Sequence, residues 1–384
     1  MSERQEFVAF AGQEGANVAA LCRRFGISRK TGYTWLTRAG QGAAALADRS
    51  RRPRASPRTT SPDVEAAVLA TRAAHPAWGG RKLPQALARE GLGQPPAPST
   101  ITAILRRHGQ LAPAPPPRDC VRFEHPTPND LWQLDFLGHR ALDRGRVHPM
   151  TLRDDHSRFA LALAACGDER HATVTAQLTA ALRRSGLPRL VLTDNGAPWA
   201  PAGRPTGLTR LEAWWLRLGI APWHGAPAHP QTQGKGERFH GTIAAEVFAQ
   251  RVLPDLAAAQ AGFDAFRLTY NHERPHEALG CAVPAERYQP SPRPFPETRP
   301  EIVYGPDDAV RLVTVHGSIP WQGRRAFVSR GVVGLPVGVR PTAEDGVWHV
   351  YFCHRRVATI DRRRPSEGSP MSPHTCYLSL RSAH

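Results

Sequence analysis

The chain has 384 residues, 41% of them hydrophobic, which is enough for about two to four domains with real cores. Its 50 Lys and Arg against 33 Asp and Glu give a net charge of +17, which favours a polyanionic partner, most simply nucleic acid. No signal segment and no run of about 18 apolar residues is visible, and none of the six cysteines forms a C-x-x-C pair. We therefore expect a soluble cytoplasmic protein that is not membrane-bound and has no disulfide framework.

The positive charge is concentrated at the N-terminus. Residues 1–125 carry 19 Lys and Arg against 9 Asp and Glu, whereas residues 126–296 carry 19 against 16 and residues 297–384 carry 12 against 8. This distribution predicts that the N-terminal part grips DNA and that a more neutral central part does the chemistry.

Residues 1–47 have the pattern of a helix-turn-helix DNA-binding domain. In VAALCRRFGISRKTGYTWLTRAG, Gly26 permits a sharp turn between two helices, and Ser28 is placed to cap the second. The second helix starts with polar and basic residues, as recognition helices do; the alternative is an ordinary helical hairpin. The candidate DNA contacts of this helix are Arg29, Lys30, Thr31 and Tyr33.

The next two segments also carry positive charge. Residues 48–62 are a basic linker that either follows phosphates or enters a minor groove, or is a simple solvated spacer. Residues 63–111 predict a second helix-turn-helix, winged or not. The candidate DNA contacts of these two segments are Arg51, Arg52, Arg54, Arg81, Lys82, Arg106 and Arg107.

The remaining chain divides at proline-rich stretches. Residues 125–290 alternate strand-like and helical patterns, which predicts an α/β core with a mixed five-stranded sheet. Residues 301–364 contain short strands with turn signals, which predict a small all-β, barrel-like domain. Residues 365–384 are expected to be a loosely ordered tail.

Three acidic residues in three separate motifs are the most informative feature of the core. Asp135 lies inside the strand-like run LWQLDFLGH, where an unpaired charge is costly, and Asp194 ends the strand-like RLVLTD. Glu237 follows Gly-Lys-Gly, and we expect it to start a helix, whose positive end favours an anionic cluster. Carboxylates from two strands and a helix can hold divalent metal ions, which catalyse phosphodiester chemistry.

Other polar residues lie close to these three in the sequence. Asp154 and Asp155 also end a strand; we favour a role in a hairpin turn over one beside the cluster. Lys235 and Arg238 flank Glu237 and are candidate DNA-phosphate contacts, with solvated helix charges as the alternative. Asn195 is expected to shape the turn after Asp194, with ligand orientation as the alternative. His229 and His240 are expected to have structural or weak roles, with contact to DNA or to the metal shell as the alternative.

The motifs LWQLDFLGH, LTDNGAPW and HPQTQGKGERFHGTI, followed by YNHERPHEALGCAVPAERY, resemble the catalytic core of bacterial insertion-sequence transposases related to retroviral integrases. The resemblance covers about residues 1–290 and is weaker for the β-rich C-terminus. It implies an RNase H-like fold and an Asp-Asp-Glu site formed by Asp135, Asp194 and Glu237. Each such site would hold two Mg²⁺ (or Mn²⁺) ions.

The resemblance also implies a function. A transposase would bind the terminal inverted repeats of its insertion sequence, hydrolyse a phosphodiester at each end and transfer the freed 3′-hydroxyl into target DNA. Its partners would be double-stranded DNA and further copies of itself, at least a dimer, at the bacterial nucleoid. Two alternatives stay open: a transposase-derived DNA-binding regulator with a silent core, and an RNase H-like structure-specific nuclease.

Two features depart from the retroviral pattern. The interval from Asp194 to Glu237 is 43 residues, longer than in many retroviral-type cores, and the extra stretch PAGRPTGLTRLEAWW is expected to be a surface insertion before a helix. The zinc-binding His/Cys module of retroviral integrases is absent, and helix-turn-helix patterns stand in its place.

Overall fold

The computed structural model describes residues 2–48, 60–111, 124–194, 196, 199, 207–224, 230–249 and 252–363. The contacts of the chain form two compact units, Met1–Ser61 and Pro62–His384. None of the helices in these described ranges is long and apolar enough to cross a membrane.

The first unit is a small helical bundle. Gly26 has φ +62°, in the left-handed region, and makes the turn between the second and third helices, as the sequence predicts. Ser28 caps the third helix by accepting a hydrogen bond from the Thr31 amide at 3.1 Å. The helices are α1 (Glu3–Ala11), α2 (Val18–Arg24) and α3 (Arg29–Ala39), followed by the 3₁₀ turn η1 (Ala43–Leu46).

The second unit begins with three more helices around their own apolar core. Residues 60–111 are all described and contain no strand, so this bundle has no β wing. The segments between its helices are short, Gly- and Pro-containing turns, which leave no room for a hairpin. The helices are α4 (Pro62–Ala74), α5 (Leu83–Arg89) and α6 (Pro98–Arg107), and their core includes Val68, Trp78, Leu83, Leu87, Ile101 and Leu105.

A mixed sheet forms the centre of the second unit. Its order is β2-β3-β1-β5-β6, with β4 also paired to β3; β1 is antiparallel to β3 but parallel to β5, and β5 is parallel to β6. The sequence predicts five strands, and the sixth is the two-residue β2, too short to show a pattern of its own. The strands are β1 (Leu131–Phe136), β2 (Arg140–Ala141), β3 (Arg146–Asp154), β4 (Ala160–Cys166), β5 (Leu190–Thr193) and β6 (Ala221–His224).

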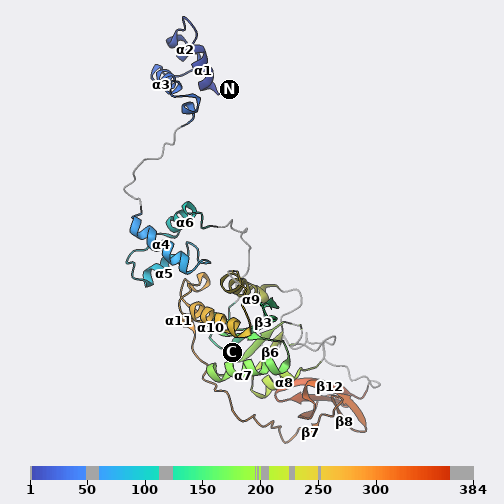
Figure 1. Cartoon of the computed structure of the whole chain (residues 1–384). Coiled ribbons are helices and arrows are strands. Elements are labelled where there is room, and N and C mark those ends of the chain that lie inside the picture. The colour runs from blue at the N-terminus through green and yellow to red at the C-terminus, as the bar shows by residue number, and fades with distance from the viewer. Residues whose placement is uncertain are drawn as a thin grey trace. The chain divides into compact units, whose positions relative to one another are not determined.

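Helices cover both faces of this sheet (Figure 1). On one face, α7 (His171–Ser185) and α8 (Arg210–Arg217) pack against the strands through Leu178, Leu211 and Trp215. On the other face lie α9 (Pro230–Ile243), its π-helical continuation η2 (Ala244–Phe248) and α10 (Leu256–His272). The strands are therefore buried on both sides, which explains their continuous apolar runs.

The start of α9 corrects a prediction. We expected a helix starting at Glu237, but α9 already begins at Pro230, a residue type favoured in a first helical turn. Glu237 therefore lies near the middle of the helix, where the helix dipole adds little. Phe239 and Ile243 anchor α9 in the core, and this packing outweighs the low helix propensity of the glycines before Glu237.

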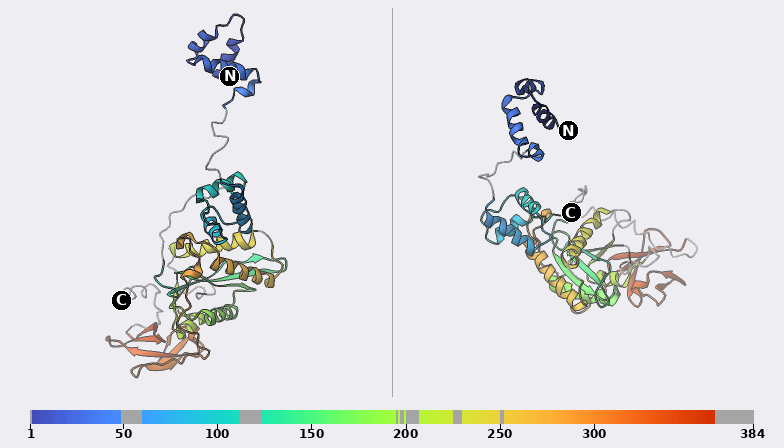
Figure 2. Two further views of the ribbon diagram at one scale, coloured as in Figure 1. Left: turned by 90° about the vertical axis from the view of Figure 1, so that its left-hand side faces the viewer. Right: turned by 45° about the horizontal axis from the view of Figure 1, so that its top comes forward.

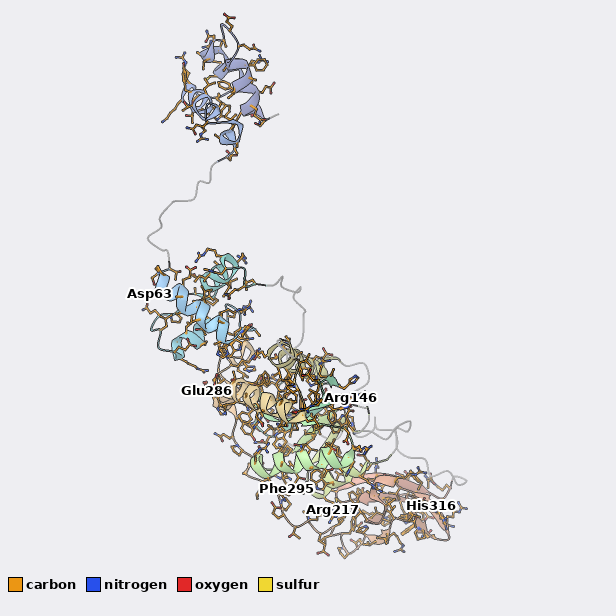
Figure 3. All side chains as sticks on the ribbon, viewed as in Figure 1. Asp63, Arg146, Arg217, Glu286, Phe295 and His316 are labelled. Atoms are coloured by element: carbon orange, nitrogen blue, oxygen red, sulfur yellow. The ribbon has the colours of Figure 1, made fainter. Side chains whose placement is uncertain are left out.

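The proline-rich segment after α11 (Pro284–Arg287) is fixed along the core (Figure 3). The amide of Ser291 donates to the Ser185 carbonyl at 2.8 Å, and the guanidinium of Arg293 donates to the carbonyls of Pro188, Leu218 and Gly219. This segment is a strap with defined contacts, although its composition reads as a linker.

The described part of the chain ends in two small sheets that share one core, and the predicted tail, residues 365–384, lies outside it (Figure 2). The four-stranded sheet has the order β12-β11-β10-β7, and β8 pairs with β9. Three residues of the central domain, Leu208, Ala213 and Leu216, also belong to this core, so the helix α8 contributes to two cores. The strands are β7 (Ala309–Leu312), β8 (Ser318–Trp321), β9 (Arg324–Phe327), β10 (Pro336–Pro341), β11 (Val347–Phe352) and β12 (Arg355–Asp361).

The order of these parts confirms the predicted fold class: helical modules, an α/β core and an all-β end. The stretch PAGRPTGLTRLEAWW before Glu237 was expected to be a surface insertion. Over its described length this is wrong, because Leu211 and Trp215 of α8 are buried. Residues 201–206 of that stretch lie outside the described part.

Candidate functional site

Asp135 and Asp194 lie at equivalent ends of two neighbouring parallel strands. The register of β1 and β5 pairs Gln133 with Leu192, and each aspartate follows two residues later: Asp135 within β1 and Asp194 directly after β5. Because both strands run in the same direction, their carboxyl ends meet at one edge of the sheet, where sites form in α/β folds. The structure thus brings these two predicted site residues together.

Asp194 is close enough to affect the protonation of Asp135. Burial, together with the charge of Asp194, raises the pKa of Asp135 to about 6, against the hydrogen bond that Asp135 accepts from the Phe136 amide at 2.8 Å. Asp194 accepts a hydrogen bond from the Gly196 amide at 3.0 Å. A raised pKa means that the negative charge at this edge of the sheet is poorly compensated by the protein.

Glu237 is exposed on α9, close to this edge. The preceding Gly236 faces Asp135, since a Cβ built on it would lie 3.9 Å from Asp135 Oδ2. The residues that the structure describes contain no preassembled group of three His, Cys, Asp or Glu side chains able to hold a metal ion. Asp135 and Asp194 are thus paired in the structure, while Glu237 is adjacent without completing a three-ligand site.

A buried polar network holds α9 against the sheet. The Asp155 carboxylate, fully buried, accepts hydrogen bonds from Lys235 Nζ at 2.6 Å, Gln133 Nε2 at 2.8 Å and the His125 amide at 2.9 Å. Arg153 donates to the Lys235 carbonyl at 2.9 Å and to the Gln133 side chain. Two of these contacts, from Lys235 to Asp155 and from Arg153 to Lys235, hold α9 at a position two residues before Glu237.

The neighbouring Asp154 does what we predicted for both aspartates. Its carboxylate accepts hydrogen bonds from the Ser157 amide at 2.8 Å and hydroxyl at 2.6 Å, which closes the turn between β3 and β4. Asp155 lies in the same turn, as expected, directly after the end of β3. Its side chain, however, bonds to Gln133, His125 and Lys235, so it also holds α9 against the sheet.

His240 links α9 to the strand that carries Asp135. Its Nε2 lies 3.1 Å from Thr151 Oγ1, which in turn donates to the Asp135 carbonyl at 3.1 Å. Burial and the nearby Arg153 and Arg140 lower the pKa of His240 to about 4. A neutral imidazole that holds two elements together fits the structural role predicted for it.

A second histidine, not predicted, lies behind Asp194. His224 Nδ1 is 3.3 Å from the Asp194 carbonyl oxygen and 3.2 Å from Thr193 Oγ1, and Nε2 is 2.9 Å from Glu212 Oε1. Burial alone would lower the pKa of His224, yet the hydrogen bond and charge of Glu212 outweigh it and raise the pKa. The sequence gives no signal for this pair, because Glu212 reads as an ordinary helix-capping residue.

The predicted DNA contacts on α3 are accessible, with one exception. Arg29, Lys30 and Tyr33 are exposed, Tyr33 to 59%. The hydroxyl of Thr31 lies 2.9 Å from Ser28 Oγ and takes part in the helix cap. Three candidates in the basic linker, Arg51, Arg52 and Arg54, lie outside the described residues, as do Asn195 and His229.

Most other predicted DNA contacts have partners within the protein. Arg81 pairs with Glu277 at 2.9 Å, and Arg107 pairs with Glu65 at 2.8 Å. Lys82 is half-buried, and burial lowers its pKa to about 8. Lys235 turns inward to Asp155, so it is the candidate least available to a phosphate. Arg81, Arg106, Arg107 and Arg238 are all exposed.

Family models match almost the whole length of the chain. A helix-turn-helix domain matches residues 3–54, and a homeodomain-like domain matches residues 31–105. Two integrase core domain models match residues 125–230 and 218–284. The C-terminal domain of the IS481 family transposase matches residues 308–368.

Two similar proteins come from bacterial insertion elements. The first is the insertion element IS407 uncharacterized 31.7 kDa protein of Burkholderia multivorans, 27% identical over 236 residues, which cover 59% of this chain and 82% of that protein. The second is the insertion element IS476 uncharacterized 39.2 kDa protein of Xanthomonas euvesicatoria, 29% identical over 159 residues, or 41% of this chain and 44% of that protein.

Solved structures with some similarity are retroviral. The simian T-cell lymphotropic virus intasome in complex with a PP2A regulatory subunit matches 76% of this chain and 98% of its own, at 18% identity and a TM-score of 0.37. The HTLV-2 integrase catalytic core domain in complex with magnesium matches 43% of this chain and 99% of its own, at 17% identity and a TM-score of 0.34.

The integrase core matches place the mixed sheet and its helices in the RNase H-like fold. The flanking matches add DNA-binding helices before this core and a transposase domain after it. With relatives in two bacterial insertion elements, the chain is similar to bacterial insertion-sequence transposases with an integrase-like core.

Proposed function

We propose that the protein binds the terminal inverted repeats of its own insertion sequence, hydrolyses a phosphodiester at each end and transfers the freed 3′-hydroxyl into target DNA. One observation carries the proposal: Asp135 and Asp194 lie side by side at the carboxyl ends of β1 and β5, within the segment that the integrase core models match. Such a pair of carboxylates is suited to phosphodiester chemistry.

The carboxylates fit a divalent metal site. Asp135 and Asp194 offer hard oxygen donors, which Mg²⁺ and Mn²⁺ prefer, and the raised pKa of Asp135 reflects uncompensated negative charge that a cation would relieve. We assign Glu237 as the third ligand, because Gly236 beside it faces Asp135. When bound, two such ions would neutralise the charge that builds up on the phosphate during displacement.

The rest of the chain supplies DNA and the second active site. Arg29, Lys30 and Tyr33 on the exposed start of α3 would contact the repeats in the major groove. Arg238, exposed beside Glu237, would contact a phosphate near the reacting bond. Joining two element ends requires two active sites held together, so we propose at least a dimer on DNA at the bacterial nucleoid.

The experiment uses the full chain and a duplex taken from one end of the element. Asp135→Asn, Asp194→Asn and Glu237→Gln should each lower Mg²⁺-dependent end cleavage by about a thousandfold or more, because each removes a charged metal ligand. Binding to the same duplex should stay within about threefold, a small change in binding energy. Asp143→Asn, at an exposed position outside the site, is the matched control and should keep both activities.

Each failure has a distinct meaning. Cleavage retained in one variant removes that residue from the site. A wild-type protein that binds the repeats without cleaving them in Mg²⁺ or Mn²⁺ would overturn the proposed chemistry and favour a regulator. Preferred cleavage of an RNA–DNA hybrid over the duplex would favour a nuclease.

A further inference from the structure

The β-rich C-terminal domain grips the chain immediately before α8. Ser329, 1% exposed, donates its hydroxyl to the Leu208 carbonyl and accepts from the Leu208 amide, both at 2.9 Å. It also accepts from the Gly331 amide at 3.1 Å. A hydroxyl offers one donor and two acceptor positions, so all hydrogen-bonding positions of Ser329 are occupied.

Gly331 shows how closely the two backbones approach. A Cβ built at this position would overlap the Leu208 carbonyl oxygen and lie 2.6 Å from the carbonyl carbons of Leu208 and Thr209. All these atoms are main-chain atoms, which cannot swing aside as a side chain would. The turn η4 (Arg330–Val332) therefore requires glycine for docking, not for an unusual φ angle.

The helix that follows depends on this docking. α8 has eight residues, and helices shorter than about 12 residues are marginal without tertiary packing. One side of α8 places Leu211 and Trp215 in the core of the central domain, and another side places Ala213 and Leu216 in the core of the C-terminal domain. Its position is therefore set by both domains together.

The start of α8 is connected to the strand end that carries Asp194. Glu212, 3% exposed, accepts a hydrogen bond from the Thr209 amide at 2.7 Å, one residue after the Ser329 contact. Its other oxygen lies 2.9 Å from His224 Nε2, and His224 Nδ1 lies 3.3 Å from the Asp194 carbonyl oxygen. A series of buried and half-buried polar contacts thus runs from Ser329 to the backbone carbonyl of Asp194.

We propose that the C-terminal β domain positions the Asp194 carboxylate, through Ser329 and Gly331 at the start of α8 and then through Glu212 and His224. The domain is on this view a structural part of the catalytic centre, in addition to any contact it makes with DNA. Ser329, Glu212 and His224 are positioning residues and touch no substrate. The proposal rests on the proposed function only in taking Asp194 as a metal ligand.

The test measures Mn²⁺ binding to the full chain, by the electron paramagnetic resonance signal of free Mn²⁺. Gly331→Ala should weaken Mn²⁺ binding about tenfold or more, the usual range for residues that orient metal ligands. The matched control is Gly305→Ala in the same domain, whose new Cβ would lie 3.6 Å from Asp308 Oδ2, an ordinary contact. This control should bind Mn²⁺ like the wild type.

Amide hydrogen exchange distinguishes undocking from unfolding. In Gly331→Ala, the amides of α8 should exchange faster while the strands β10 to β12 keep their protection. His224→Ala should also weaken Mn²⁺ binding but leave α8 protected. Combining the two changes should add little, because both act along one series of contacts.

The outcomes separate this proposal from the proposed function. Mn²⁺ binding that is unchanged in Asp194→Asn would overturn the metal site itself and this proposal with it. Mn²⁺ binding that is lost in Asp194→Asn but unchanged in Gly331→Ala would overturn the positioning role alone, as would loss of protection in β10 to β12 or fully additive effects with His224→Ala.

Discussion

At the scale of single residues, Asp154 and Asp155 show how identical neighbours can take different roles. Asp154 closes the turn at the end of β3 through Ser157, whereas Asp155, the next residue, binds Lys235 of α9. Both carboxylates are fully buried, so each must be fully hydrogen-bonded to be tolerated. The helix that carries Glu237 is thus held by a buried ion pair.

Asp155→Asn should destabilise the second unit by about 3 kcal/mol or more, because Lys235 and Arg158 would keep their charges without the compensating carboxylate. Urea-induced unfolding of the full chain, followed by tryptophan fluorescence, measures the change. Asp264→Asn is the control: its ion pair with Arg267 spans 3.7 Å and is exposed, so the expected loss is below about 1 kcal/mol. Equal losses in the two variants would show that the Asp155 network stabilises the protein no more than an exposed ion pair does.

A half-buried histidine, His276, makes stability depend on pH. Burial, together with Arg274 and Lys82, lowers the pKa of His276 to about 3, compared with about 6.5 in an unfolded chain. Between these values the unfolded state binds more protons, so the free energy of unfolding falls as the pH falls. Below about pH 6.5, each pH unit of acidification should lower the free energy of unfolding by up to about 1.4 kcal/mol. Above about pH 6.5 this pH dependence should vanish.

His276→Gln should therefore reduce the slope of the unfolding free energy against pH between about pH 6 and pH 4. The reduction should be at most the slope that corresponds to the uptake of one proton. Denaturant titrations at several pH values measure it, with His272→Gln as a control at an exposed position in the same segment. If both variants change the slope alike, His276 is not the titrating group.

At the scale of elements, the sequence predicted those features that depend on interactions between residues close together in the chain. The caps, the Gly26 turn and the strand runs that carry Asp135 and Asp194 follow from short-range sequence features. Parallel strand ends then bring the two aspartates together. The start of α9 was misplaced because packing of Phe239 and Ile243 outweighs two glycines.

Contacts between distant segments could not be predicted in the same way. Lys235 meets Asp155 across 80 residues, and Ser329 meets Leu208 across 121 residues. Nothing in the local sequence around Ser329 distinguishes it from a surface serine. Such pairings depend on the final arrangement of the domains, which hydrophobic periodicity and secondary-structure propensity do not encode.

Close packing of the first unit provides a test at the element scale. A Cβ on Gly32 of α3 would lie 2.6 Å from Cys22 Sγ and 3.0 Å from Phe7 Cζ. The gain in helix propensity from Gly32→Ala is about 1 kcal/mol, and overpacking costs about 1–3 kcal/mol, so we expect a net loss of stability. Hydrogen exchange of the α1–α3 amides in the full chain should report it.

Two variants check the cause of that loss. Adding Cys22→Ala to Gly32→Ala should recover part of the lost protection, because it removes the overlapping sulfur. Gly12→Ala, whose Cβ would lie 3.6 Å from the Val8 carbonyl, should not reduce protection. Unchanged protection in Gly32→Ala would mean that α3 can shift away from α1 and α2 at little cost.

At the scale of the whole molecule, positive charge counts toward DNA binding only where it is available. In the described part of the N-terminal region, Arg81, Arg89 and Arg107 form ion pairs with glutamates. Arg29 and Lys30, at the start of α3, form no ion pair with any described residue. The net charge of +17 therefore overstates the number of cations ready to meet a phosphate.

This difference predicts how salt affects DNA binding. Each phosphate that a protein neutralises contributes about 0.9 to the slope of log affinity against log salt concentration. Lys30→Gln should therefore reduce the slope by about one if its ammonium contacts a phosphate. Arg107→Gln should reduce it by clearly less, because Arg107 must first give up Glu65, 2.8 Å away. Fluorescence anisotropy with an element-end duplex, from about 50 to 200 mM salt, measures both slopes. An equal or larger change in Arg107→Gln would mean that DNA breaks the internal pair, and that the ion pairs of the second helical bundle are resting-state contacts which open on binding.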